Sequence, residues 1–139
     1  MENLSEFIVN HWVLVTLFVV LSSLVMSGSL NSKISGMTSI GAAEAVRIAN
    51  QQKGLFLDIR EVSEFAKEHI ADSKNMPLSK LADESGALKD QEQALILVCA
   101  SGQRTGSAAK QLRKQGFSNI YALKGGLNTW KEAKLPLFS

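Results

Sequence analysis

The chain has little of the material from which disulfides and metal sites are built. It contains 1 cysteine, 2 histidines and 2 prolines among 139 residues. A single cysteine excludes an intrachain disulfide and a cysteine-rich zinc site, and it favours a reducing compartment in which the thiol stays free. The histidines, His11 and His69, lie far apart and show no metal-ligand spacing. We therefore expect no bound metal.

The chain also has little excess of positive over negative charge. The 15 basic and 13 acidic residues leave a formal net charge of +2, and the basic residues are scattered along the chain. Nucleic-acid-binding proteins concentrate Lys and Arg on one face, often with aromatic residues between them. The sequence shows no such cluster, so we expect no nucleic-acid partner.

Charged residues are missing altogether from Trp12 to Leu30, where nearly every side chain is apolar. A helix over 12–30 would be roughly 28 Å long, close to the hydrocarbon core of a bilayer at about 30 Å. A small soluble domain would not bury a helix that is apolar all round. The run predicts one transmembrane helix, with His11 and Trp12 at the membrane interface.

A cleaved signal peptide is the alternative for this segment. Signal peptides begin with a basic region, whereas this chain begins with Glu2 and Glu6 and has no Lys or Arg before the apolar run. The small residues Ser27, Gly28 and Ser29 would nevertheless suit a cleavage site. The alternative stays open at this stage, although a retained membrane anchor is favoured.

Basic residues set the expected orientation of the span. None precedes it, while Lys33 and Arg47 follow it. By the positive-inside rule the C-terminal side lies in the cytoplasm and the short N-terminus lies outside. The lipid bilayer is then a partner of the chain, and the small residues of the span would also permit contact with other membrane proteins.

These patterns divide the chain into four parts: a short N-terminal segment at 1–11, a transmembrane helix at 12–30, a polar linker at 31–37 and a soluble domain at 38–139. In the last part, predicted strands at 55–59, 94–98 and 119–123 and a brief extended piece at 74–78 alternate with helical patterns at 42–52, 61–70, 105–117 and 125–133, and 81–91 is a polar helix or loop. Such alternation predicts an α/β domain with a mostly parallel central sheet and helices on both sides.

The only cysteine follows the most apolar of these runs. In open parallel sheets, ligands bind beyond the carboxyl ends of the strands, and Cys99 lies at such an end. The next residues must turn into a helix, so their N–H groups are expected to form an anion cradle that favours the Cys99 thiolate. The predicted cradle consists of Ala100, Ser101, Gly102, Gln103, Arg104 and Thr105.

Side chains of this loop add to the expected chemistry. Arg104 and the hydroxyls of Ser101 and Thr105 could bind the molecule that Cys99 attacks. A lone cysteine is more often a buried small residue than a nucleophile. The glycine and the arginine that follow Cys99 favour the nucleophile, because a purely structural cysteine does not need them.

The stretch CASGQRTG resembles the active-site loop of rhodanese-like domains, Cys-x-x-Gly-x-Arg-Ser. Three further stretches in the same order, FLDIRE, EFAKEHIADSKNMPL and LKGGLNTW, resemble other motifs of this family. Their matching residues are Asp58, Ile59, Arg60, Glu64, Phe65, His69, Ile70, Asn75, Pro77, Gly125, Gly126 and Trp130. Glu68 and Asp72 stand where the family has glycine, and Thr105 stands where it has serine.

The resemblance implies a rhodanese-like fold and a sulfurtransferase activity without a cofactor. Cys99 would take sulfane sulfur from thiosulfate or a persulfide and pass it, as a Cys99 persulfide, to a thiol or another thiophilic acceptor. Asp58 and Arg60 would support the neighbouring loops, with Arg60 pairing Glu64 four residues on. Together with the apolar span, the chain is similar to membrane-anchored single-domain bacterial rhodaneses, which implies a single-pass protein of the inner (cytoplasmic) membrane.

Two other functions are compatible with these motifs. Phosphatases that resemble this fold use Cys-x5-Arg, whereas Cys99 and Arg104 form the shorter Cys-x4-Arg, which suits one sulfur atom better than a tetrahedral phosphate. A membrane-tethered interaction or regulatory module with little turnover is the second alternative. The retained cysteine and loop argue against it without excluding it.

Overall fold

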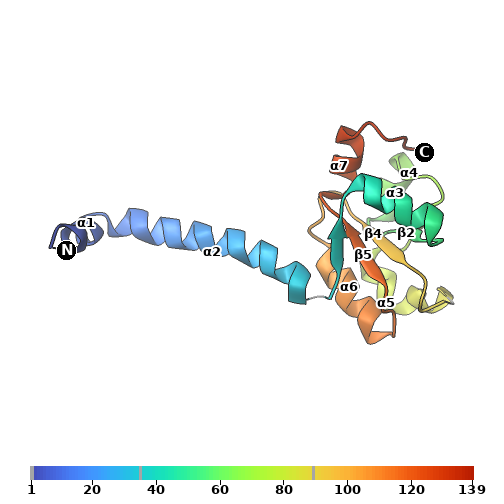
Figure 1. Cartoon of the computed structure of the whole chain (residues 1–139), viewed down its shortest axis with the longest axis horizontal. Coiled ribbons are helices and arrows are strands. Elements are labelled where there is room, and N and C mark those ends of the chain that lie inside the picture. The colour runs from blue at the N-terminus through green and yellow to red at the C-terminus, as the bar shows by residue number, and fades with distance from the viewer. Residues whose placement is uncertain (1, 35, 89) are drawn as a thin grey trace. The chain divides into compact units, whose positions relative to one another are not determined.

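The computed structural model describes residues 2–34, 36–88 and 90–139 (Figure 1). Position 35 of the expected linker and position 89 of the polar stretch at 81–91 lie outside the described residues. The chain separates into two compact units, 1–31 and 32–139. The boundary falls inside the segment predicted as a linker.

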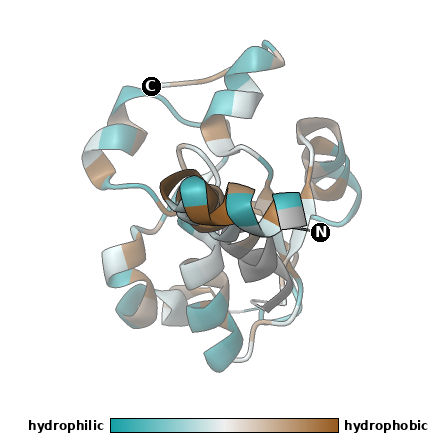
Figure 2. Ribbon diagram, turned by 90° about the vertical axis from the view of Figure 1, so that its left-hand side faces the viewer, coloured by the Kyte–Doolittle hydropathy of each residue, from teal (hydrophilic) through white to brown (hydrophobic). Residues whose placement is uncertain are grey.

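Helix α1 (Glu2–Asn10) and helix α2 (Trp12–Ile34) form the N-terminal part. The segment predicted as a short N-terminal piece is therefore helical, and α1 carries hydrophilic and hydrophobic residues in turn (Figure 2). The prediction of a linker from residue 31 is wrong for residues 31–34, which continue α2. The physical reason is that Asn31, Ser32, Lys33 and Ile34 include no helix-breaking Pro or Gly.

The N-terminal helices leave many apolar side chains exposed. These large side chains are Leu4, Phe7, Ile8, Val9, Trp12, Val13, Leu14, Leu17, Phe18, Val19, Val20, Leu21, Leu24, Val25 and Met26. Among the described residues, no single helix has the length and apolar character needed to cross a membrane. Asn3–Asn10 and Trp12–Met26 meet that requirement only as a pair, with a bend of 83° between them. The single span predicted at 12–30 stays a prediction.

The second unit is an α/β domain whose described strands form one 5-stranded sheet in the order β1-β5-β4-β2-β3. Every pairing in the sheet is parallel. The strands are β1 (Thr38–Ile40), β2 (Leu55–Asp58), β3 (Lys74–Asn75), β4 (Leu95–Val98) and β5 (Ile120–Leu123). The helices are α3 (Ala42–Gln51), α4 (Val62–Lys67), η1 (Leu78–Lys80), α5 (Leu81–Glu84), η2 (Ser85–Ala87), α6 (Thr105–Lys114) and α7 (Gly126–Glu132).

This architecture confirms the predicted parallel sheet, and it places the most apolar run, β4, at the centre. Strand β1 was not predicted. It has three residues, of which only Ile40 is buried, so its sequence lacks the apolar run that marks β2, β4 and β5. It lies at the edge of the sheet beside β5, and only this tertiary contact makes it a strand.

Side chains of β4 alternate between two cores, one on each face of the sheet. Leu95, Leu97 and Cys99 belong to the core that includes Leu81 of α5 and Leu112 of α6. The side chains between them, Ile96 and Val98, belong to the core built with α3 and α7. Helices therefore cover both faces, as predicted (Figure 1). The thiol lies on the face covered by α6, which begins directly after the cysteine loop.

Candidate active site

Cys99 follows the last residue of β4 and is almost completely buried, with 1% of its surface exposed. Its Sγ accepts a hydrogen bond from the N–H of Gly102 at 2.8 Å. The side chain is thus both a member of the core and the acceptor of a backbone donor from its own loop. A donor at this distance stabilises negative charge on the sulfur, which is what a nucleophilic thiolate requires.

The cysteine loop turns back on itself before α6 begins. Gly102 adopts φ +88°, a backbone conformation that favours glycine, and its carbonyl accepts a hydrogen bond from the Thr105 hydroxyl at 3.0 Å. This bond closes the loop directly before the first turn of α6. Of the predicted cradle, Ser101 and Gln103 are exposed, Ala100, Gly102 and Arg104 are half-buried, and Thr105 is buried.

The start of α7 packs under the beginning of the cysteine loop. The N–H groups of Leu127 and Asn128 donate to the carbonyls of Cys99 and Ala100 at 2.8 and 3.1 Å. Gly126 lies at this contact with φ +59°, and a Cβ there would lie 2.3 Å from the Cys99 carbonyl oxygen. Gly126 therefore permits close backbone packing between α7 and the loop.

Asp58 and Arg60 form a buried ion pair beside the loop. The Arg60 side chain reaches both carboxylate oxygens of Asp58, through Nη2 at 2.7 Å and Nε at 3.0 and 3.1 Å. Nη2 also donates to the carbonyl of Glu68 at 2.7 Å, and Asn75 donates to the carbonyls of Asp58 and Arg60. The pair links the end of β2 to the segments around α4 and β3.

The prediction that Arg60 pairs with Glu64 is wrong. Arg60 precedes the first residue of α4, Val62, so the helical spacing that brings residues four apart together does not apply to it. Asp58 instead offers Arg60 a bidentate contact in a buried setting.

Glu64 pairs with the cysteine loop instead. Its Oε1 lies 3.5 Å from Nη2 of Arg104, 40 positions along the chain. Its Oε2 accepts the N–H of Glu61 at 2.9 Å, as part of the capping box that begins α4. The hydrogen bond from Glu61 holds the pKa of Glu64 below its ordinary value, with Arg104 adding to this effect and partial burial opposing it. Glu64 is therefore ionised at neutral pH.

A cleft of about 240 Å³ opens between α4 and α7 and reaches the cysteine loop at Ala100. Its lining residues are Arg60, Glu64, Lys67, Glu68, Ala100, Leu127, Asn128 and Lys131. Lys131 of α7 forms an ion pair with Glu68 at the end of α4. Sequence reasoning missed Lys131 and Asn128, because nothing in their spacing connects them to Cys99.

His69 packs and hydrogen-bonds within its own segment of the chain. Its ring stacks on Phe65 with centroids 4.0 Å apart, and its Nδ1 is hydrogen-bonded to the Phe65 carbonyl at 2.9 Å. Its backbone pairs with Phe138 near the C-terminus. In the described part of the chain, no group of three or more His, Cys, Asp and Glu side chains is arranged to hold a metal ion.

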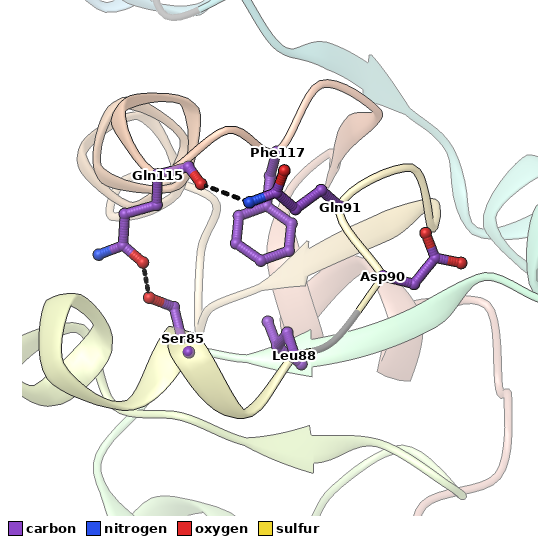
Figure 3. Close-up of a pocket in the computed structure, with 7 residues that line it drawn as sticks. Ser85, Leu88, Asp90, Gln91, Gln115 and Phe117 are labelled. Carbon is purple, nitrogen blue, oxygen red and sulfur yellow. Dashed lines mark hydrogen bonds between the residues drawn. The ribbon is translucent and has the colours of Figure 1, made fainter.

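A second cavity, of about 390 Å³, lies at the opposite end of the sheet, between the segments that precede β4 and β5 (Figure 3). The buried Ser85 hydroxyl donates to the side chain of Gln115, and the Gln91 amide donates to the Gln115 carbonyl. The Gln115 amide donates in turn to the carbonyl of Ala82. These polar groups are hydrogen-bonded to one another, so they connect α5 to the end of α6 and do not point to a ligand site.

Residues 41–133 match the family model described as "Rhodanese-like domain". The chain is 31% identical over 139 residues to the uncharacterized protein YibN of Escherichia coli K12, covering 99% of this chain and 97% of YibN. It is 32% identical over 92 residues to the thiosulfate sulfurtransferase GlpE of Coxiella burnetii, covering 66% of this chain and 85% of GlpE. It also matches an uncharacterized Synechocystis protein at 39% identity over 90 residues, but spans only 50% of that protein's length.

Among solved structures, a rhodanese-related protein of Thermoplasma volcanium is similar with a TM-score of 0.64 and 30% identity. The alignment covers 73% of this chain and 97% of that protein. The similarity extends over the α/β domain that carries Cys99, the Asp58–Arg60 pair and the glycine pair.

Proposed function

The chain belongs to the rhodanese-like domain family, and from this premise we propose that it is a membrane-anchored sulfurtransferase working through a persulfide on Cys99. The observation that carries the proposal is the N–H of Gly102 placed 2.8 Å from the Cys99 sulfur. The relatedness to GlpE, named a thiosulfate sulfurtransferase, supports the same reaction type. Thiosulfate or a small persulfide is the proposed donor, and a thiol or another thiophile is the proposed acceptor.

The reaction has two displacement steps. The Cys99 thiolate attacks the outer sulfur of thiosulfate; a new sulfur–sulfur bond forms, the old one breaks, and sulfite leaves with the electron pair. The acceptor, cyanide in an assay or a thiolate in the cell, then attacks the terminal sulfur of the persulfide. That sulfur leaves with the acceptor, and Cys99 regains its thiolate. The protein needs only a nucleophile and a charge-stabilising loop for these steps, and no cofactor takes part.

The residues around Cys99 support both steps. The Gly102 N–H stabilises the thiolate before the attack and after the sulfur has been released. Leu127 and Asn128 donate to the carbonyls of Cys99 and Ala100, which holds the start of the loop in place. Asp58 and Arg60 hold the neighbouring strand end in place.

A phosphatase is disfavoured by the loop length. Arg104 follows Cys99 by one position fewer than in Cys-x5-Arg enzymes, and its neighbour Thr105 already begins α6. The tight turn at Gly102 places its N–H directly at the Cys99 sulfur. A tetrahedral anion would need a wider loop whose N–H groups surround it.

We further propose that the N-terminal segment anchors the domain in the inner membrane, with the α/β domain in the cytoplasm. The charge-free run from Trp12 to Leu30 and its exposed apolar side chains support the anchor. Lys33 and Arg47 after the run support the orientation.

Activity is tested on the full-length chain purified in detergent. With thiosulfate and cyanide we expect thiocyanate, and mass spectrometry should find one added sulfur atom on the peptide that contains Cys99. The Cys99→Ser variant should lose at least about 10³-fold in rate, because a hydroxyl is a poor substitute for a thiolate nucleophile. Thiocyanate formation by this variant at the wild-type rate would remove Cys99 from the reaction. A wild-type chain that acquires no sulfur from any of several donors would favour an interaction module instead.

A further inference from the structure

Arg104 is the cation of the cysteine loop, and its charge is partly compensated. Its Nη2 lies 3.5 Å from Oε1 of Glu64, and the two side chains are 37% and 39% exposed. Arg104 immediately precedes α6, whereas Glu64 lies in α4. The contact therefore connects the loop to a different element on the wall of the cleft.

Glu64 is held in place independently of Arg104. Its Oε2 accepts the N–H of Glu61 at 2.9 Å within the capping box of α4, which leaves Oε1 toward the arginine. Because the same hydrogen bond lowers the pKa of Glu64, the carboxylate stays charged across the neutral range. The ion pair thus has one fixed partner, Glu64, and one long flexible partner, Arg104.

The other charges of the cleft are paired as well. Arg60 is compensated by the buried Asp58, and Lys131 is compensated by Glu68. Lys67 also lines the cleft, and within the described residues it has no ion-pair partner. The arginine of the cysteine loop therefore already faces a carboxylate, beside a cleft with a small excess of positive charge.

We propose that Glu64 is a positioning residue that sets which donor charge the site prefers. It orients Arg104 beside the loop and offsets part of its charge, so that singly charged sulfur donors are favoured over dianions. This inference rests on the proposed function, because it concerns the donors of that same site. Thiosulfate is a dianion, and it meets the Glu64 carboxylate as a like charge; a thiosulfonate or an organic persulfide carries less charge and is repelled less.

Two donors of different charge test the proposal on the full-length chain in detergent. Thiosulfate carries two negative charges and methanethiosulfonate carries one, and both deliver a sulfane sulfur to cyanide. In Glu64→Gln we expect the KM for thiosulfate to fall about three- to tenfold, the range of a partly screened charge near a surface. The KM for methanethiosulfonate should change less, and kcat should stay within about twofold for both donors.

Three controls separate charge from structure. Glu64→Asp keeps the carboxylate and should keep the wild-type ratio of the two KM values. Glu44→Gln removes a carboxylate from the exposed Glu44–Arg47 pair of α3 and should leave both KM values unchanged. High salt should reduce the difference between wild type and Glu64→Gln, because it screens exposed charges.

A KM change that is equal for the two donors, no change at all, or a higher thiosulfate KM in Glu64→Gln would overturn the inference. A loss of kcat for both donors together with a lower unfolding temperature would also overturn it, because Glu64 would then serve only the structure of α4. These results require a wild type that transfers sulfur. If the wild type takes up no sulfur on Cys99 from either donor, the proposed function fails rather than the role of Glu64.

Discussion

At the scale of single residues, the burial of Cys99 is compatible with its proposed role as a nucleophile. The side chain is 1% exposed and packs in a core with Leu97 and Leu112, yet its sulfur receives a backbone N–H from Gly102. The apolar neighbours Leu97 and Leu112 have no group that could donate a hydrogen bond to this sulfur. The loop supplies the donor that the core lacks, which explains how a buried cysteine can serve as the proposed nucleophile.

Gly126 offers the most direct test of this arrangement. Its φ of +59° disfavours any residue with a Cβ, and that Cβ would lie 2.3 Å from the Cys99 carbonyl oxygen. We expect Gly126→Ala to destabilise the domain by about 1–3 kcal/mol and to lower activity, because the start of α7 must move away from the loop. Urea unfolding followed by circular dichroism measures the first effect, and thiocyanate formation measures the second.

Gly86 provides the matched control for this substitution. An added Cβ there would meet nothing within 4 Å. Gly86→Ala should therefore change the free energy of unfolding by no more than about 0.5 kcal/mol. Equal destabilisation by the two variants would show that the contact between α7 and the loop is not tight.

At the scale of elements, α4 is a short helix with a large influence on the site. It has six residues, and in isolation a helix of this length would not be stable. Its capping box, the hydrogen bond from Arg60 to the Glu68 carbonyl, and the ion pairs of Glu64 and Glu68 hold it against the loop and α7. The stability of α4 therefore depends on contacts with the residues of the site that it lines.

The lowered pKa of Glu64 predicts how this helix responds to acid. A carboxylate whose pKa is lower in the folded than in the unfolded chain stabilises the fold at pH values above its unfolded pKa, about 4.3. That contribution is lost as the pH falls through the lower folded value. We expect wild type to exceed Glu64→Gln in unfolding free energy at pH 7 by less than about 1 kcal/mol, because the carboxylate is partly exposed.

Urea titrations of the two proteins at pH 7, 5 and 3 measure this difference. It should persist between pH 7 and 5 and shrink as the pH is lowered further, because the wild-type carboxylate then takes up a proton. A difference that grows as the pH falls would contradict the stabilising role of the ionised Glu64.

At the scale of the whole molecule, the chain joins two units of opposite character. In the unit at 1–31 the large apolar side chains of residues 4–26 are mostly exposed, whereas the unit at 32–139 buries such side chains on both faces of a sheet. Exposed apolar surface of this extent on a soluble protein would be a site of association. A lipid environment satisfies it without a protein partner, which is the basis of the proposed anchor.

The proposed orientation predicts where the C-terminus lies. In a bacterial host, a reporter fused after Ser139 should give the signal of a cytoplasmic protein, because Lys33 and Arg47 follow the apolar run and no basic residue precedes it. A reporter that is active only when exported serves as the opposite control. Activity of that second reporter at Ser139 would reverse the orientation, and release of the soluble domain from membranes would favour a cleaved signal peptide.

The sequence alone determined the features that depend on neighbouring residues. Short apolar or extended stretches predicted four of the strands and a mostly parallel sheet, and the turn from the run at 94–98 into the next helix located Cys99, because these signals arise from local spacing. The same local reasoning failed where a signal was weak or absent. It missed β1, which has one buried residue, and it ended α2 before residues 31–34, which continue the helix.

The tertiary structure alone decided which charges meet. Sequence spacing suggested Glu64 as the partner of Arg60, but the fold pairs Arg60 with Asp58 and brings Glu64 to Arg104 across 40 positions. It also brings Gly126 against the Cys99 carbonyl. An ion pair or a close backbone contact depends on distance in space and on burial, and parallel strands joined through helices bring together residues that no local pattern connects.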